Sequence, residues 1–216
     1  MNATLAPVDT KTRILDAAER VFSQDGFDGA SLRSITAAAQ VNLAAVNYHF
    51  HSKEALFSAV IERRVRPINQ RRLEMLDAIP GKPSPEAILD AFVRPPFELS
   101  SKEHSVVRPL MARLLSVPRE LHTRLIEENF GPLLNRFVDA LAEALPASPR
   151  EELQWRMFFV VGAMTQTMAW GPIMAKFIDG KPNLADVEAL TARLVRFGAA
   201  GMRAPASDLP NTRVNQ

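Results

Sequence analysis

Apolar residues recur every three or four positions along most of this 216-residue chain. No segment alternates convincingly between apolar and polar residues, which is the pattern that half-buried strands produce. The helical spacing is clear near the N-terminus, at Ile14, Ala18, Val21 and Phe22. The periodicity therefore predicts an all-α fold.

Composition narrows the class of protein. Hydrophobic residues make up 47% of the chain and charged residues 23%, which is typical of a globular protein. The chain has no cysteine, which excludes disulfides, thiolate catalysis and cysteine-bound zinc. The first residues lack the layout of a signal peptide, and the longest apolar run, Met157 to Met164, is too short to span a bilayer. We therefore expect a cytoplasmic protein with no membrane partner.

The net charge of +2 does not by itself indicate a nucleic-acid partner, although arginines gather in one region. This cluster consists of Arg63, Arg64, Arg66, Arg71 and Arg72. Such a run can form a basic patch for nucleic acid or a solvated helix face, and the sequence leaves both interpretations open.

Capping residues predict where helices begin. Ser31, Asn42, Ser52 and Ser84 each precede a stretch with helical spacing. Side chains of this kind accept hydrogen bonds from the free N–H groups of a first helical turn. The four predicted helices end near residues 40, 50, 78 and 92, respectively.

Three further signals concern the second half of the chain. Pro95 and Pro96 are expected to end the fourth of these helices, because proline lacks the N–H that a helix interior needs. The sequence SPRE, at residues 148–151, has the form of a capping box and predicts the start of a long apolar helix. Asn183, with Asp186 three residues later, predicts the start of the last helix.

The helices predicted at 31–40 and 42–50 are joined by almost no linker and supported by a third helix, which is the layout of a helix-turn-helix. The second helix of such a unit enters the major groove, so its outward side chains must be small or able to form hydrogen bonds. Asparagine can pair with adenine, and alanine or leucine can contact a thymine methyl group. The predicted base-facing residues are Leu43, Ala44, Ala45 and Asn47.

Polar groups flank this helix. Tyr48, the only tyrosine of the chain, and His49 are expected at its rim, where a phenol and an imidazole can donate to phosphate oxygens. Lys53 adds a positive charge at the N-terminus of the next helix. The sequence HFH, at residues 49–51, also suggests metal, but no third ligand accompanies it and no metal site is predicted.

The segment Thr12–Leu56 as a whole closely resembles the DNA-binding domain of the TetR/AcrR family of bacterial transcriptional regulators. The motifs that carry the resemblance are RILDAAERVFSQDGF, SLRSITAAA and YHFHSKEAL. The resemblance implies an N-terminal helix-turn-helix domain over residues 1–52 and a helical effector-binding and dimerisation domain over 53–203. The polar tail, 204–216, is expected to fray.

The resemblance also assigns residues. It places Leu43, Ala44, Ala45 and Asn47 at base-facing positions, and it matches Ser31, Arg33, Tyr48, His49 and Lys53 to the family's phosphate contacts. The sequence departs from the family pattern at Gln40, where the turn usually has glycine, and at Asn47, where an aromatic residue is common. The base preference of other members therefore does not transfer to this chain.

A dimer is predicted from the C-terminal helices. The stretch 153–170 is apolar almost all round, so one core-facing side does not account for it. Together with the last helix it is expected to form a four-helix bundle with a second copy of the chain. The predicted interface residues are Trp155, Phe159, Leu190, Leu194 and Phe197.

An effector pocket is predicted among apolar residues of the C-terminal region, with a plain hydrophobic core as the alternative. An inward arginine there would need an anionic partner such as a carboxylate, whereas a surface ion pair is its ordinary alternative. The predicted pocket residues are Phe92, Phe97, His104, Val107, Arg108, Met111, Leu114, Phe130, Phe158, Thr165 and Met168.

The stretch NLAAVNYHF is similar to a subgroup that includes fatty-acid-responsive regulators. The resemblance therefore implies a repressor that a small amphipathic effector, such as a fatty acid or an acyl thioester, releases from a palindromic operator. No cofactor is implied. Effector binding is expected to tilt the helix 53–78 and lower the affinity for DNA.

Two other classes of protein are alternatives to a regulator. An enzyme is not expected, because the chain has no GxSxG, HExxH, P-loop or GxGxxG motif and no cysteine nucleophile. A helical protein that binds lipids or other small molecules, without a DNA role, is the alternative. Steeply salt-dependent binding to DNA would separate the two, because phosphate contacts release counterions.

Overall fold

The computed structural model describes residues 9–102, 117–180 and 182–205, and nearly all of these residues are helical. The predicted all-α class is confirmed. The chain divides into two compact units, which we describe separately: Met1–Ile68 with Ser100–Gly131, and Asn69–Leu99 with Pro132–Gln216. This division differs from the predicted one at residue 52, because the start of α4 (Lys53–Asp77) contributes to the core of the first unit.

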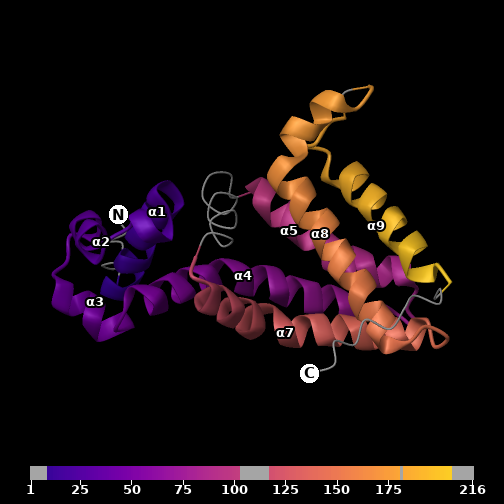
Figure 1. The fold of residues 1–216 in the computed structure, drawn as a ribbon, viewed down its shortest axis with the longest axis horizontal. Coiled ribbons are helices and arrows are strands. Elements are labelled where there is room, and N and C mark those ends of the chain that lie inside the picture. Colours follow the sequence, from indigo (N-terminus) through magenta and orange to yellow (C-terminus); the bar gives the residue numbers. More distant parts are fainter. Residues whose placement is uncertain (1–8, 103–116, 181, 206–216) are drawn as a thin grey trace, which may run out of the picture. The chain divides into compact units, whose positions relative to one another are not determined.

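The first unit holds α1 (Thr10–Gly29), α2 (Leu32–Ala39) and α3 (Leu43–Phe50) together with the start of α4 (Figure 1). Apolar side chains from all four helices, and from the start of α7 (Arg119–Ala144), form one buried cluster. The core of the predicted three-helix unit is therefore completed by α4 and α7.

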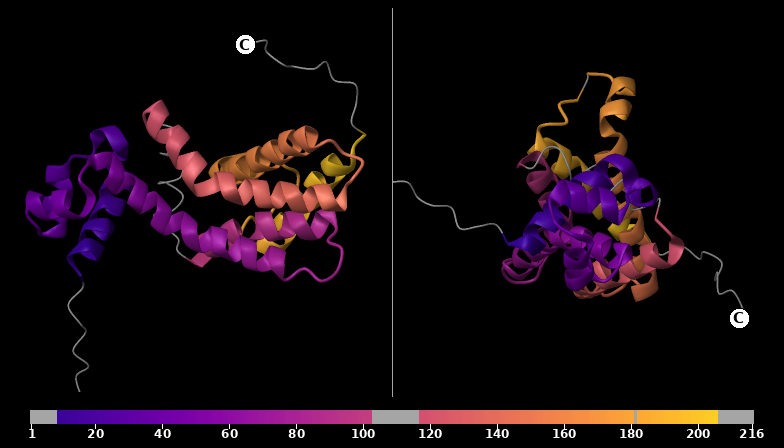
Figure 2. Two further views of the ribbon diagram at one scale, coloured as in Figure 1. Left: turned by 90° about the horizontal axis from the view of Figure 1, so that it is seen from below. Right: turned by 90° about the vertical axis from the view of Figure 1, so that its left-hand side faces the viewer.

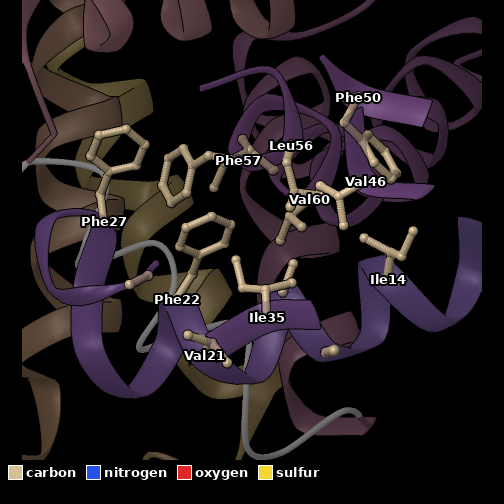
Figure 3. Close-up of a cluster of buried hydrophobic side chains, with 14 of the residues drawn as sticks. Ile14, Val21, Phe22, Phe27, Ile35, Val46, Phe50, Leu56, Phe57 and Val60 are labelled. Carbon is tan, nitrogen blue, oxygen red and sulfur yellow. The ribbon is translucent and has the colours of Figure 1, made fainter. Parts of the chain in front are cut away.

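Three phenylalanine rings lie together within that core (Figure 3). The centroid of Phe57 lies 5.0 Å from that of Phe22 and 5.3 Å from that of Phe27. Both pairs are close to perpendicular, which is the favourable edge-to-face arrangement of aromatic rings. These rings fix how α1 and α4 pack against each other.

Four of the helix starts that were predicted from capping residues are confirmed. The side chains of Ser31, Asn42, Ser52 and Ser84 each accept a hydrogen bond from the backbone N–H three residues later, at 2.8–3.2 Å. α5 (Pro85–Lys102) begins directly after the last of these caps. Each cap satisfies a donor that the first turn of a helix cannot satisfy internally.

The turn between α2 and α3 requires a left-handed backbone. Gln40 has φ 54° and ψ 48°, the conformation that glycine adopts without a steric penalty. A side chain with a Cβ adopts it at a cost of about 1–2 kcal/mol. The sequence therefore places a mildly strained residue at the point where the helix-turn-helix changes direction.

Gln40→Gly is expected to raise the free energy of unfolding by about 0.5–1 kcal/mol, after the larger backbone entropy of glycine in the unfolded chain is subtracted. Urea denaturation followed by circular dichroism measures the change. Ala38→Gly is the matched control, because Ala38 is exposed within α2 and glycine there should destabilise by about 1 kcal/mol. A lower stability of Gln40→Gly would contradict the assignment of strain.

The second unit contains parts of α4, α5 and α7 together with α8 (Arg150–Met174) and α9 (Val187–Arg203). α8 and α9 run in opposite directions, and the short helix η2 (Ala175–Phe177) follows α8 (Figures 1 and 2). A Cβ at Gly198 would lie 3.0 Å from Leu89 Cδ1 and 3.1 Å from Val160 Cγ2. Glycine therefore allows α9 to approach both α5 and α8 closely.

The prediction that Pro95 and Pro96 end a helix was wrong, because α5 continues through them to Lys102. Proline cannot donate to the carbonyl four residues earlier, so Pro96 leaves the Phe92 carbonyl without its helical partner. The Nε–H of Arg72 donates to that oxygen at 2.8 Å. A side chain from α4 thus replaces the missing backbone donor.

Two predicted helix starts also differ from the structure. Ser148 does not cap α8; Pro149 occupies the N-cap position and forms no side-chain hydrogen bond. The last helix begins after Asp186 instead of Asn183, and Asp186 Oδ1 accepts from the N–H of Ala189 at 3.0 Å. In both places the N-cap residue lies one to three positions after the residue that the local motif had suggested.

Within the described ranges, no helix combines the length and the hydrophobicity that crossing a lipid bilayer requires.

Candidate functional site

One face of α3 is exposed and carries small or polar side chains. Leu43 is 44% exposed and Tyr48 79%, and Ala44 and Asn47 are also exposed. These four positions are separated by one, three, four or five residues, so they share one side of the helix. Val46 and Phe50 on the opposite side are buried in the core of the first unit. α3 therefore presents a surface that can approach a flat or grooved partner closely.

Two further predicted residues lie at the edges of this face. Ala45 is only partly exposed and packs against the buried core. His49 is also partly exposed, and its ring lies 5.1 Å from that of Tyr48. The exposed centre of the face consequently contains Leu43, Ala44 and Asn47, with Tyr48 beside them.

Ser31 and Arg33 lie at the start of α2, and both are exposed. Ser31 Oγ accepts from the N–H of Ser34 at 3.0 Å and so completes the first turn. A helix N-terminus with exposed hydroxyl and guanidinium groups is suited to bind an anion.

Arg13 holds the turn between α2 and α3, a role that the sequence did not indicate. Its Nη2 donates to the carbonyl of Ala39 at 2.7 Å and to that of Gln40 at 3.0 Å. A cation at the C-terminus of a helix is favourable because the last carbonyls lack helical partners. The partners are backbone atoms 26 and 27 residues away, so no local pattern predicts them.

Lys53 is more buried than its predicted phosphate role suggests. Its Nζ donates to the carbonyls of Phe27 and Ala30 at 3.0 and 3.2 Å, and it lies 4.3 Å from the centroid of the Phe27 ring. Lys53 therefore attaches the connection between α1 and α2 to the start of α4. An ammonium group has three donors, so one remains for an anion.

The arginine cluster of α4 is largely neutralised by carboxylates. Arg63 contacts Asp16 of α1 at 2.5 Å and Arg64 contacts Glu19 of α1 at 2.6 Å. Further along α4 the pairs are Arg66 with Glu62 and Arg71 with Glu74. These pairings do not support a free basic patch on α4. The fifth arginine, Arg72, is buried.

Arg72 is a buried arginine of the second unit that was not among the predicted pocket residues. Its side chain lies among α4, α5 and α8 and is 3% exposed. Nε donates to the Phe92 carbonyl at 2.8 Å, Nη1 to Asn69 Oδ1 at 3.1 Å and Nη2 to Met164 Sδ at 3.5 Å. Burial lowers the pKa of the guanidinium to about 9.

The predicted pocket residues that the structure describes belong to both units. Phe92 and Phe97 are buried in the second unit, and the Phe92 ring lies 5.1 Å from that of Phe137. Phe130 packs against the core of the first unit instead. Met168 is partly exposed.

The other members of the predicted pocket are exposed or lie outside the described ranges. Phe158 is 63% exposed, and the exposed Thr165 donates its hydroxyl to the Val161 carbonyl of its own helix. Five predicted members lie outside the described residues: His104, Val107, Arg108, Met111 and Leu114.

Three of the predicted dimer residues form exposed apolar positions on α8 and α9. Trp155 is 49% exposed, Phe159 60% and Phe197 68%. Trp155 and Phe159 stack with centroids 6.2 Å apart. Leu190 and Leu194 are partly buried within the unit. An isolated subunit would expose these rings to water, which is unfavourable.

No three side chains of the types that ligate metals gather among the residues that the structure describes.

Comparison with known proteins gives two family matches. Residues 14–60 match the family described as bacterial regulatory proteins, tetR family, and residues 90–201 match the tetracyclin repressor-like C-terminal domain. The second match alone spans more than half of the chain.

Among curated relatives, the HTH-type transcriptional regulator AcrR of Shigella flexneri is 40% identical over 75 residues, which are 35% of each chain. The HTH-type transcriptional repressor NicS of Pseudomonas putida is 39% identical over 72 residues, which cover 32% of this chain and 34% of NicS. The sequence thus matches about a third of the length of these relatives.

Solved structures extend the similarity to nearly the whole chain. FadR from Bacillus subtilis, in complex with stearoyl-CoA, has a TM-score of 0.69 at 20% identity, covering 88% of this chain and 98% of that one. A TetR-family regulator from Bordetella parapertussis has a TM-score of 0.64 at 18% identity, covering 89% and 95%. At these identities the similarity establishes the fold.

Proposed function

Since this chain belongs to the tetR family of bacterial regulatory proteins, we propose that it is a ligand-responsive regulator that binds operator DNA as a homodimer. The family consists of transcriptional regulators, and we assign this chain no catalytic activity. The proposed mode is repression that a small amphipathic effector relieves. The protein is proposed to act in the cytoplasm.

The observation that carries the proposal is the exposed face of α3. Leu43, Ala44 and Asn47 are small or able to form hydrogen bonds, and no bulky charged side chain lies among them. A helix of this kind fits the major groove, where asparagine can recognise adenine and apolar groups can contact thymine. Arg13 and Lys53 hold the helices that present this face.

A dimer is supported by the exposed rings of α8 and α9. Pairing these helices with their copies would cover Phe159 and Phe197 in a four-helix bundle. Two copies of α3 would then bind successive major grooves about 34 Å apart, and the operator would have a palindromic sequence.

An amphipathic effector is supported by the tetracyclin repressor-like C-terminal domain and by the fold shared with FadR, whose structure contains stearoyl-CoA. The effector would bind the second unit. The effector lowers the affinity for the operator if it binds best to a conformation that does not fit DNA. By thermodynamic linkage, the operator then lowers the affinity for the effector by the same factor.

The proposal is tested by selecting random duplex DNA with the purified full chain at two salt concentrations. We expect a palindromic motif whose affinity falls steeply with salt, because phosphate contacts release counterions. Absence of enrichment at the lower salt would contradict the regulator and favour a helical protein that binds small molecules only.

Asn47→Ala and Tyr48→Phe are expected to have different effects on the selected operator. Loss of the Asn47 amide should reduce discrimination at one base step by about 1–3 kcal/mol. Loss of the Tyr48 hydroxyl should weaken binding to every sequence by about 3- to 10-fold, because a phosphate contact carries no base information. Dissociation constants for the operator and for single-base variants measure both.

Both side chains are exposed, so neither substitution should change thermal unfolding. If the two variants alter affinity for all sequences in the same way, the division of roles between Asn47 and Tyr48 is wrong.

A further inference from the structure

We propose that Arg72 binds the acidic head group of an amphipathic effector. The inference rests on the proposed ligand-responsive function and names the class of ligand together with the residue that recognises it. The carboxylate or phosphate of the effector accepts hydrogen bonds from the guanidinium. The apolar part of the effector lies against side chains of the same unit.

The first observation is a buried cation without an acidic partner. A buried guanidinium is costly unless an anion pairs with it. The Arg72 side chain is 3% exposed, and no ion pair joins it to a carboxylate in the described part of the chain. Desolvation, with no neighbouring charge to offset it, lowers the pKa of this group.

Arg156 shows how the same unit buries an arginine for structural purposes. It is 7% exposed, and its Nε contacts Glu152 at 2.8 Å while Nη1 donates to the Met202 carbonyl at 2.7 Å. A carboxylate thus accompanies this buried guanidinium. The partners of Arg72 are neutral, so no carboxylate among the described residues balances its charge.

The donors of Arg72 are only partly used. A guanidinium has five N–H groups, and the described contacts occupy three of them. One of the three acceptors is the Met164 sulfur, which is a weak acceptor. The described contacts leave one N–H on Nη1 and one on Nη2. Two such donors can bind the two oxygens of one carboxylate or phosphate in a bidentate contact.

The guanidinium is also held in position before any ligand binds. Pro96 cannot donate to the Phe92 carbonyl, and Arg72 Nε takes that acceptor. The Arg72 Cζ lies 4.1 Å from the centroid of the Phe92 ring. Two contacts with one residue therefore fix the position of the group, and less entropy is lost when an anion binds.

The neighbours of Arg72 suit an acyl chain. The rings of Phe92 and Phe137 meet edge to face, and Met164 is a flexible apolar side chain that adapts to irregular ligands. Apolar walls with one fixed polar group are typical of sites for small amphipathic molecules. The surroundings therefore favour a compound with one acidic end over a multiply charged polar one.

The experiment compares three compounds with the same twelve-carbon chain: dodecanoate, dodecyl phosphate and 1-dodecanol. Isothermal titration of the full-length protein gives their dissociation constants. We expect at least one acid to bind more tightly than the alcohol by roughly 10- to 100-fold, since hydrogen bonds to charged groups are strong. The order of the two acids distinguishes a carboxylate from a phosphate head group.

Arg72→Met should reduce the affinity for the acids to that for the alcohol, and Arg72→Lys should give an intermediate value because it keeps the charge without the planar fork. Arg71→Met is the matched control, because Arg71 is the preceding residue of α4 and is half exposed beside Glu74. It should leave all three affinities unchanged. Circular dichroism checks that each variant folds, and Arg72→Lys decides the comparison if Arg72→Met does not.

Unchanged acid binding in the folded Arg72 variants would overturn the proposal, as would equal affinity of the wild-type protein for the acids and the alcohol. Failure to bind any of the three compounds would overturn it too. The operator selection on the same preparation separates this failure from that of the regulator. A palindromic motif without acid binding rejects only the role of Arg72, whereas acid binding without a motif rejects only the DNA role.

Discussion

Phe57→Ala is expected to lower the free energy of unfolding of the first unit by about 3–5 kcal/mol. Phe57 is fully buried, and its ring contacts those of Phe22 and Phe27 edge to face. Removing the ring leaves a cavity at the point where α1 and α4 meet, and it deletes two aromatic contacts at once. Because total stability of a domain is about 5–15 kcal/mol, this loss would remove a large fraction of the stability of the unit.

Urea denaturation, followed by circular dichroism and by hydrogen exchange of the helices of the first unit, measures the loss. Tyr48→Ala is the matched control, because it removes an aromatic ring that is 79% exposed and should change stability by less than about 0.5 kcal/mol. A loss below about 1 kcal/mol in Phe57→Ala would mean that the three rings contribute little to the stability of the core.

Phe159→Glu is expected to convert a dimer into monomers. Phe159 is 60% exposed on α8 and stacks on Trp155, so a second copy that covers this face would bury it. A carboxylate placed in a buried apolar interface loses its hydration without gaining a partner. If the buried carboxylate weakens the free energy of association by roughly 3 kcal/mol or more, the dissociation constant of the dimer should rise by at least about 100-fold.

Sedimentation equilibrium of the wild-type and variant chains measures that constant. The affinity for a palindromic operator should also fall, because each monomer would carry only one copy of α3. Asn135→Glu, on the exposed side of α7 in the same unit, introduces the same charge and should leave the dimer intact. A Phe159→Glu protein that remains dimeric would place the interface elsewhere.

Features that depend on neighbours in the sequence could be predicted from it. The caps at Ser31, Asn42, Ser52 and Ser84 follow from a side chain and an N–H three residues apart, and the structure has all four. The exposed face of α3 follows from the same periodicity that buries Val46. Local geometry decides these features, so the local pattern was sufficient for them. The local motifs at Ser148 and Asn183, by contrast, named the wrong capping residue.

Features that depend on distant partners could not be predicted. Proline normally ends a helix, but burial of Phe92 and Phe97 stabilises α5, and Arg72 supplies the donor that Pro96 lacks. Likewise, Arg13 and Lys53 bind carbonyls that lie at least 23 residues away. Tertiary contacts overrode local preference in each case.

Arg72 left a signal in the sequence that the site prediction did not use. It lies seven residues after Val65 and four before Leu76, both of which are buried on α4. Helical periodicity therefore places a charged residue on an apolar face. A charged side chain in such a position ordinarily needs a partner of opposite charge. The acids near it in sequence, such as Glu74, lie on other sides of the helix and pair with other arginines.

The ion pairs of α4 have a consequence for how such a regulator would search a chromosome. Arg63, Arg64, Arg66 and Arg71 contact carboxylates and are less available to neutralise phosphates. Binding to random DNA releases about one counterion for each phosphate that a protein cation neutralises. With fewer cations available, fewer counterions are released and the gain in entropy is smaller. The residence time on ordinary genomic sequence would then be short, and most of the time bound to DNA would be spent where α3 matches the bases.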